Sequence, residues 1–141
     1  MLGLMKERGT WIRPLDLNKL IEQVLTELEG VAIVVLEGQV DQLNLPRSQQ
    51  CLVPPTFKSE APDSAGRIAL RLGPGIAATI MNALHQSQDW VKNIEAMQIF
   101  VNGQRAFLAG DSFDSECISV WPGAPVNLVS RLVEDGLAEL L

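Results

Sequence analysis

The sequence contains a single histidine, His85, and only two cysteines, Cys51 and Cys117, among 141 residues. A structural zinc site needs about four closely spaced ligands, and these cysteines lie far apart and outside any Cys-x-x-Cys motif. We therefore expect no metal site and no cofactor, and interpret both cysteines as core or half-buried thiols. A disulfide between them is the alternative, although a reducing compartment would keep both cysteines as free thiols.

Long hydrophobic runs are also missing. The longest aliphatic run, VAIVVL at residues 31–36, is much shorter than the roughly 20 residues that a membrane-spanning helix needs. The charges of Lys6, Glu7 and Arg8 interrupt the first residues, which therefore lack the apolar core of a signal peptide. These absences predict a cytoplasmic protein that does not contact a membrane.

Basic charge is scarce, since 17 acidic residues outnumber 11 basic ones and give a net charge of −6. Binding to a nucleic acid backbone needs clustered Lys and Arg, so we expect no nucleic acid partner. Residues 106–141 hold one base, Arg131, against the carboxylates Asp111, Asp114, Glu116, Glu134, Asp135 and Glu139. This region favours either a solvated surface or an immunity or inhibitor protein that neutralises a basic partner.

What is present indicates one ordered domain over residues 1–141, because apolar residues make up 47% and charged residues 20% of the chain. The patterns predict a single α+β domain, in which three helices pack on a mainly antiparallel sheet of about five to six strands. The helices are expected at about 17–29, after the N-cap Asp16, along the apolar stripe from Ile76 to Leu84, and from Pro125 to the stop at Gly136. The strands are expected on both sides of Glu37-Gly38, at 67–72, on both sides of Asn102-Gly103, and at 117–121.

The dipeptide Asn102-Gly103 favours a two-residue type I′ hairpin between two apolar runs. That turn predicts cross-strand pairs of Val101 with Gln104, Ile99 with Ala106, and Met97 with Leu108. It also places Phe100 beside Arg105 and puts Phe107 on the same face as Phe100, where we expect both rings to be buried.

Two segments are expected to be irregular: a flexible arm at residues 1–12 and a long proline-rich loop at residues 46–67. Prolines at 46, 54, 55 and 62 leave room for only a short strand at 51–53 within the loop. The loop also carries apolar side chains, which a disordered linker would rarely hold.

Gly110-Asp111-Ser112-Phe113 resembles the nucleophile block of the GDSL-type esterases. The resemblance covers four residues and implies a small serine hydrolase in which Ser112 attacks an ester. In that family a late Asp-x-x-His block supplies the base, whereas no histidine follows Ser112 here. The competing interpretation is a turn between two strands, since Gly, Asp and Ser are turn formers. Three nearby carboxylates leave a cation site open but do not match a calcium loop.

Without a catalytic cluster, the sequence favours a non-enzymatic protein that binds another protein, as an adaptor, assembly factor or chaperone-like accessory protein. Exposed loops on a rigid scaffold often carry recognition, and indole rings often dominate interfaces. An extended or basic peptide segment and a homodimer are the partners considered. The expected contact residues are Leu52, Val53, Pro54, Pro55, Phe57 and Trp121.

Overall fold

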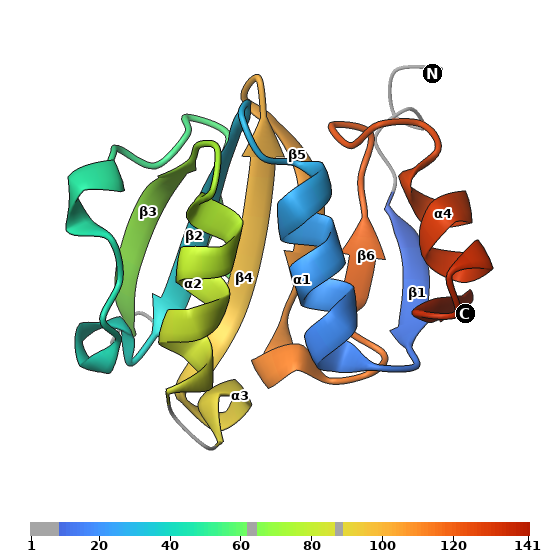
Figure 1. The fold of residues 1–141 in the computed structure, drawn as a ribbon, viewed down its shortest axis with the longest axis horizontal. Helices are drawn as coiled ribbons and strands as arrows, with labels where there is room; N and C mark the ends of the chain where they lie inside the picture. Colours follow the sequence, from blue (N-terminus) through green and yellow to red (C-terminus); the bar gives the residue numbers. More distant parts are fainter. Residues whose placement is uncertain (1–8, 62–64, 87–88) are drawn as a thin grey trace.

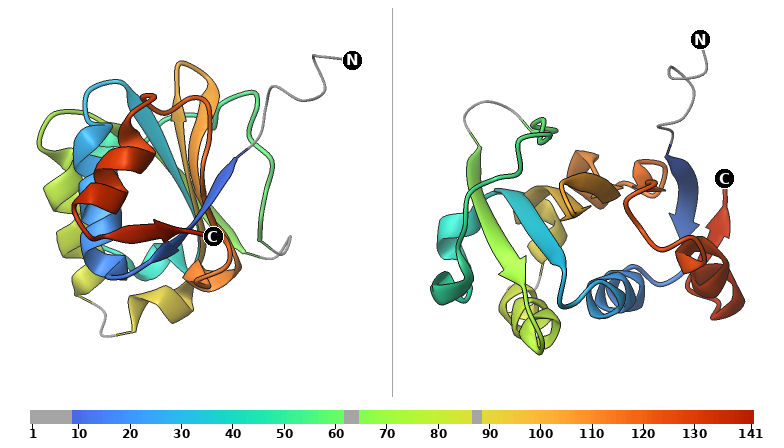
Figure 2. Two further views of the ribbon diagram at one scale, coloured as in Figure 1. Left: turned by 90° about the vertical axis from the view of Figure 1, so that its right-hand side faces the viewer. Right: turned by 90° about the horizontal axis from the view of Figure 1, so that it is seen from above.

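The computed structural model describes residues 9–61, 65–86 and 89–141, which form a single α+β domain. Within these residues seven strands make one antiparallel sheet in the order β3-β2-β4-β5-β6-β1-β7. The longer helices all lie on one face of this sheet (Figures 1 and 2). The strands are β1 (Thr10–Pro14), β2 (Ala32–Gly38), β3 (Gly66–Leu72), β4 (Ile94–Val101), β5 (Gln104–Ala109), β6 (Ile118–Val120) and β7 (Ala138–Leu140).

The predicted helices form close to where the sequence places them, as α1 (Leu17–Glu27), α2 (Ile76–His85) and α4 (Leu128–Glu134). The Asp16 carboxylate accepts a hydrogen bond from the backbone N–H of Lys19, 3.2 Å away, and so caps α1 as expected. The last helix begins at Leu128 rather than Pro125. A short helix, α3 (Trp90–Asn93), was not predicted. No helix in the described part of the chain is long and apolar enough to cross a membrane.

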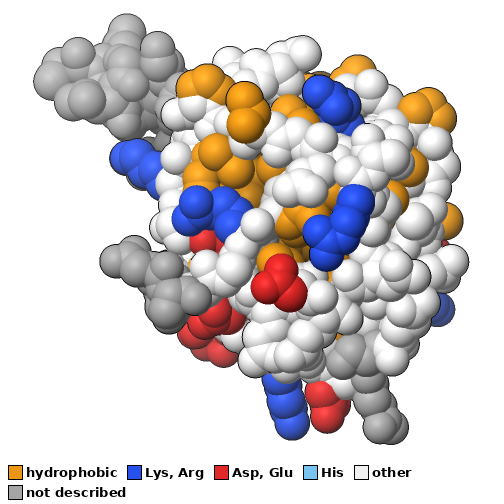
Figure 3. All heavy atoms as spheres, turned by 90° about the vertical axis from the view of Figure 1, so that its left-hand side faces the viewer, with side chains coloured by type: hydrophobic (Ala, Val, Ile, Leu, Met, Phe, Trp, Pro, Cys, Tyr) orange, Lys and Arg blue, Asp and Glu red, His pale blue; other side chains and the backbone are white. Residues whose placement is uncertain are grey.

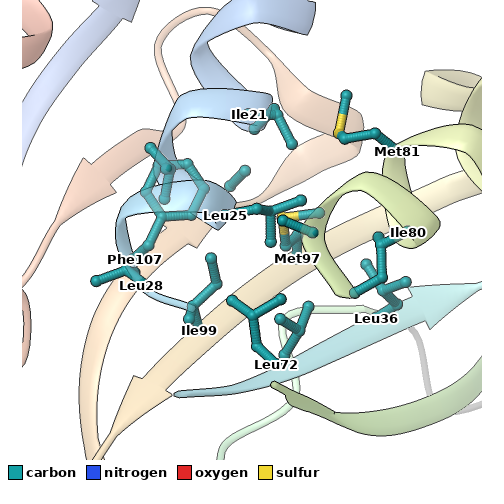
Figure 4. Packing of buried hydrophobic residues seen from close by; sticks show 14 of the residues in the cluster. Ile21, Leu25, Leu28, Leu36, Leu72, Ile80, Met81, Met97, Ile99 and Phe107 are labelled. Atoms are coloured by element: carbon teal, nitrogen blue, oxygen red, sulfur yellow. The ribbon is translucent and has the colours of Figure 1, made fainter. Parts of the chain in front are cut away.

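The main core lies between the helices and the sheet. Leu25 and Ile21 of α1 and Ile80 of α2 pack over Met97 and Phe107 of the central strands (Figure 4). All of these side chains are buried. The apolar stripes of the two helices therefore pack against the inward-facing side chains of β4 and β5 in one layer. This is expected for amphipathic helices on a half-buried sheet.

The hairpin turn is confirmed, because Asn102 and Gly103 have positive φ angles of 52° and 78° and Val101 pairs with Gln104. Phe100 lies opposite Arg105, also as predicted. The register beyond this point was wrong: a bulge at Ala106 pairs Ile99 with Phe107 and Met97 with Ala109. A bulge adds one residue to a single strand, so the following side chains change face. Phe107 therefore points into the helix layer, away from Phe100.

Gly103 allows a test of the turn alone. Its φ of 78° is costly for other residues, and a Cβ added there would meet no atom within 4 Å. Gly103→Ala should therefore lower the free energy of unfolding by about 1–2 kcal/mol through backbone conformation only. Chemical denaturation measures this loss. Gly73→Ala is the matched control, since its φ is not in the positive range and its nearest neighbours lie at 3.9 Å; an equal loss in both variants would contradict the explanation.

The sheet has more strands than the five to six expected, because both end segments contribute. Residues 10–12 of the predicted flexible arm belong to β1, and residues 138–140 form β7; residues 1–8 of that arm lie outside the described residues. Two expected strands are wrong. The residues after Gly38 turn into a 3-10 helix at Val40–Gln42, and residues 51–53 make no strand, although Gln50 bridges Leu70 next to them.

Candidate functional site

The face of the sheet opposite the helices is partly covered by residues 50–61, which we call the strap (Figure 2). Hydrogen bonds hold the strap against β3, against β4 and against the turn between β4 and β5. Cys51 N donates to the Ala69 carbonyl at 2.9 Å, and Thr56 Oγ1 donates to the Gly103 carbonyl at 2.6 Å. Gln98 Nε2 donates to the Lys58 carbonyl at 2.7 Å. The part of the predicted proline-rich loop from Cys51 to Lys58 is therefore attached to the sheet at several points.

Glu37 of β2 anchors the end of the strap. Its carboxylate is only 1% exposed. It accepts hydrogen bonds from Ser59 Oγ and from the backbone N–H of Glu60, the latter at 3.0 Å, and lies 3.5 Å from Arg67 Nη2. A buried carboxylate needs such partners to offset the loss of hydration. The position of the strap therefore depends on its contacts with the buried carboxylate of Glu37.

Phe57 packs inward from the strap. Its ring meets Phe100 edge-on at a centroid distance of 6.3 Å, and the Arg67 guanidinium lies 4.8 Å from the centre of the Phe57 ring. Val35 and Ala69 complete this small second core. Phe57 therefore holds the strap against the sheet. The sequence alone could not distinguish this role from the predicted contact with a partner.

The remaining predicted contact residues divide by exposure. Leu52 is 89% exposed and Val53 38% exposed, and Pro55 is also exposed, whereas Pro54 is buried. Figure 3 shows the side of the molecule at the β3 edge of the sheet, where exposed hydrophobic side chains lie among several Lys and Arg side chains. The strap thus presents isolated apolar side chains to solvent from a fixed backbone.

Trp121 is half-buried and borders a pocket of about 300 Å³ beside residues Thr56 and Lys58 of the strap. We call it the Trp121 pocket. One wall comes from Thr56 and Lys58 of the strap, and the rest comes from the β4–β5 hairpin and the residues after β6: Phe100, Gly103, Gln104, Arg105, Trp121, Pro122 and Gly123. Its volume is at the lower end of the range for ligand sites. The structure therefore brings the strap and Trp121 to one concave site.

The indole of Trp121 has defined neighbours. Its Nε1 donates to Ser119 Oγ at 2.8 Å, and Gly9 lies so close that a Cβ there would be 2.7 Å from Cε2. The Arg105 guanidinium carbon lies 4.8 Å from the ring centre, a cation–π distance. Arg105 and Lys58 were not predicted as site residues. Arg105 could have been predicted as a site residue, because the hairpin turn already placed it beside Phe100.

The four residues that resemble the esterase nucleophile block form a turn at the surface, outside the strap and the lining of the Trp121 pocket. Ser112 is exposed, and within the described residues its hydroxyl has no hydrogen bond to an imidazole or a carboxylate. Asp111, Ser112 and Phe113 all have positive φ angles, between 48° and 65°. This tight turn buries the Phe113 ring against Trp90 at 4.8 Å. The predicted turn therefore also serves the core.

Among the described residues no group of three or more His, Cys, Asp or Glu side chains is arranged to hold a metal ion. Both cysteines are free thiols. Burial raises the pKa of the Cys117 thiol, and the nearby carboxylates of Asp114, Asp111 and Glu116 raise it further. Burial likewise raises the pKa of Cys51.

Comparison with known proteins gives no relative from which a role could be transferred. No family model, no curated protein and no solved structure matches this chain. Its site must therefore be interpreted from its own geometry.

Proposed function

We propose that this protein is a non-enzymatic accessory protein that binds another protein through the face formed by the strap and the Trp121 pocket. The observation that carries the proposal is the exposure of Leu52, at 89%, on a backbone anchored to the sheet. Large apolar side chains held outward by a fixed scaffold are typical of recognition surfaces. Such a surface loses little conformational entropy when it binds.

The Trp121 pocket supports the same assignment. It lies next to the strap, and in it the Trp121 ring and the Arg105 guanidinium are in contact, two kinds of group that often dominate binding energy at interfaces. A partner segment that follows the strap can place one side chain in this pocket. Leu52, Val53, Pro55 and Trp121 are the proposed contact residues, while Phe57 and Pro54 hold the strap in place.

The two alternatives gain no comparable support. For a serine hydrolase, Ser112 would need an activating base. For an inhibitor of a basic protein, the carboxylates of residues 106–141 would need to form one surface. Instead Glu139 pairs with Arg13 at 3.3 Å, and Figure 1 places residues 111–116 at one end of the sheet and α4 at its side. Both alternatives stay predictions. Ester turnover tests the serine hydrolase, and salt-sensitive binding to a basic protein tests the inhibitor.

Photo-cross-linking in the native cell tests the proposal. A photoreactive amino acid at position 52 should form one dominant adduct with another protein. The same residue at position 126 is the control, because Val126 is also a fully exposed apolar side chain but lies outside the strap and the pocket. An identical adduct pattern from both positions, or no adduct from position 52, would refute this function.

A further inference from the structure

The Trp121 pocket has a charge opposite to that of the whole protein. The net charge of the chain is −6, yet Lys58 and Arg105 are the charged residues that line the pocket, and no Asp or Glu is among its described lining residues. Lys58 and Arg105 also make no ion pair with any described carboxylate. Two neighbouring cations without a counter-charge are unfavourable unless an anion or water compensates them.

Arg105 carries the strongest evidence for a missing acceptor. Its Nε atom is buried and has no hydrogen-bond partner. A buried donor without an acceptor costs free energy, more so in a charged group. The Arg105 guanidinium carbon lies 4.8 Å from the centre of the Trp121 ring, and a guanidinium is a planar donor that can meet a planar acceptor with two N–H groups at once.

We propose that the Trp121 pocket binds the carboxylate of an acidic side chain in an extended segment of the partner protein. A carboxylate matches the planar fork of Arg105, and Lys58 adds a second positive charge. Phe100, Trp121 and Pro122 give the pocket apolar walls, which suit the methylene groups that carry the carboxylate. This proposal rests on the proposed function and reverses the partner charge considered from the sequence, which was basic.

The test uses the whole protein and two blocked tripeptides, acetyl-Leu-Glu-Leu-amide and acetyl-Leu-Gln-Leu-amide. NMR of the ¹⁵N-labelled protein follows the indole N–H signal of Trp121, assigned by its loss in Trp121→Phe. The glutamate peptide should shift this signal in a saturable way, and the glutamine peptide should bind at least about tenfold more weakly, since charge-assisted hydrogen bonds are the stronger kind.

Variants then identify the cations. Arg105→Gln and Lys58→Gln should each weaken the glutamate peptide about tenfold. Arg71→Gln, which removes an exposed cation of β3 outside the pocket, should leave the affinity unchanged. Lys58 is exposed, so its variant keeps the test valid even if Arg105→Gln unfolds. Equal binding of both peptides, or equal weakening by Arg71→Gln, would overturn the proposal.

Two further probes establish the source of the carboxylate. If acetyl-Leu-Leu with a free carboxyl terminus binds and the glutamate peptide does not, the side-chain assignment is wrong. If sodium acetate alone binds as tightly as the glutamate peptide, the peptide assignment is wrong. A selective adduct at position 52 together with no peptide response would retain the proposed function and reject the carboxylate.

Discussion

Phe107→Ala is expected to lower the free energy of unfolding by about 3–5 kcal/mol, the usual cost of removing a buried aromatic ring. The bulge at Ala106 turns Phe107 into the main core, where it is fully buried beneath α1. The core cluster around Phe107 is built from helices and strands together, so its side chains cannot close around the cavity without moving whole elements. Urea denaturation measures the change.

Phe57→Ala is the matched control for Phe107→Ala. Both remove the same ring, but Phe57 is half-buried and belongs to the small second core under the strap. A smaller loss is therefore expected, confined to the strap. If Phe57→Ala were as damaging as Phe107→Ala, burial in the main core would not be what makes Phe107 important for stability.

Glu37→Ala should release the strap and lower the free energy of unfolding by about 2–3 kcal/mol, because hydrogen bonds to a charged group are among the stronger ones. The variant leaves Ser59 Oγ and the backbone N–H of Glu60 without their acceptor, and leaves Arg67 without its carboxylate. Limited proteolysis within residues 50–61, together with urea denaturation, measures both effects.

The control for Glu37→Ala is Glu60→Gln, which also removes one negative charge but from an exposed side chain of the strap itself. It should leave proteolysis and stability within about 0.5 kcal/mol of the parent. Cross-linking from position 52 should fall in Glu37→Ala and persist in Glu60→Gln if the fixed course of the strap is what presents Leu52. Equal protease resistance in Glu37→Ala and the parent protein would show that Glu37 does not hold the strap.

The sequence predicted the features that depend on neighbouring residues. Asp16 and the apolar spacing after it specify α1, and Asn102-Gly103 specifies its turn. The errors come from long-range pairing. The bulge at Ala106 places a side chain that is buried in the main core, and strand β1 pairs with β6 on one side and with β7 on the other. No local pattern at residues 10–14 carries that information.

The candidate site shows the same division. The exposed apolar residues of the strap could be singled out because they interrupt a polar, proline-rich segment. The roles of Glu37 and Gln98 could not, since each belongs to a strand and acts on residues more than 20 positions away. Lys58 and Arg105 become a pair only when the strap crosses the sheet, so the charge of the pocket is a tertiary property.

The placement of β1 has a consequence for biosynthesis. Ile12 pairs with Ile118 on one side and with Leu140 on the other, and the carbonyl of Trp11 accepts a hydrogen bond from Leu141 N. During translation, this early strand must wait for β6 and β7, which are synthesised much later, and the side chain of Ile12, buried in the fold, stays uncovered meanwhile. The nascent chain would therefore be vulnerable to aggregation or to a holdase until β6 and β7 have been synthesised.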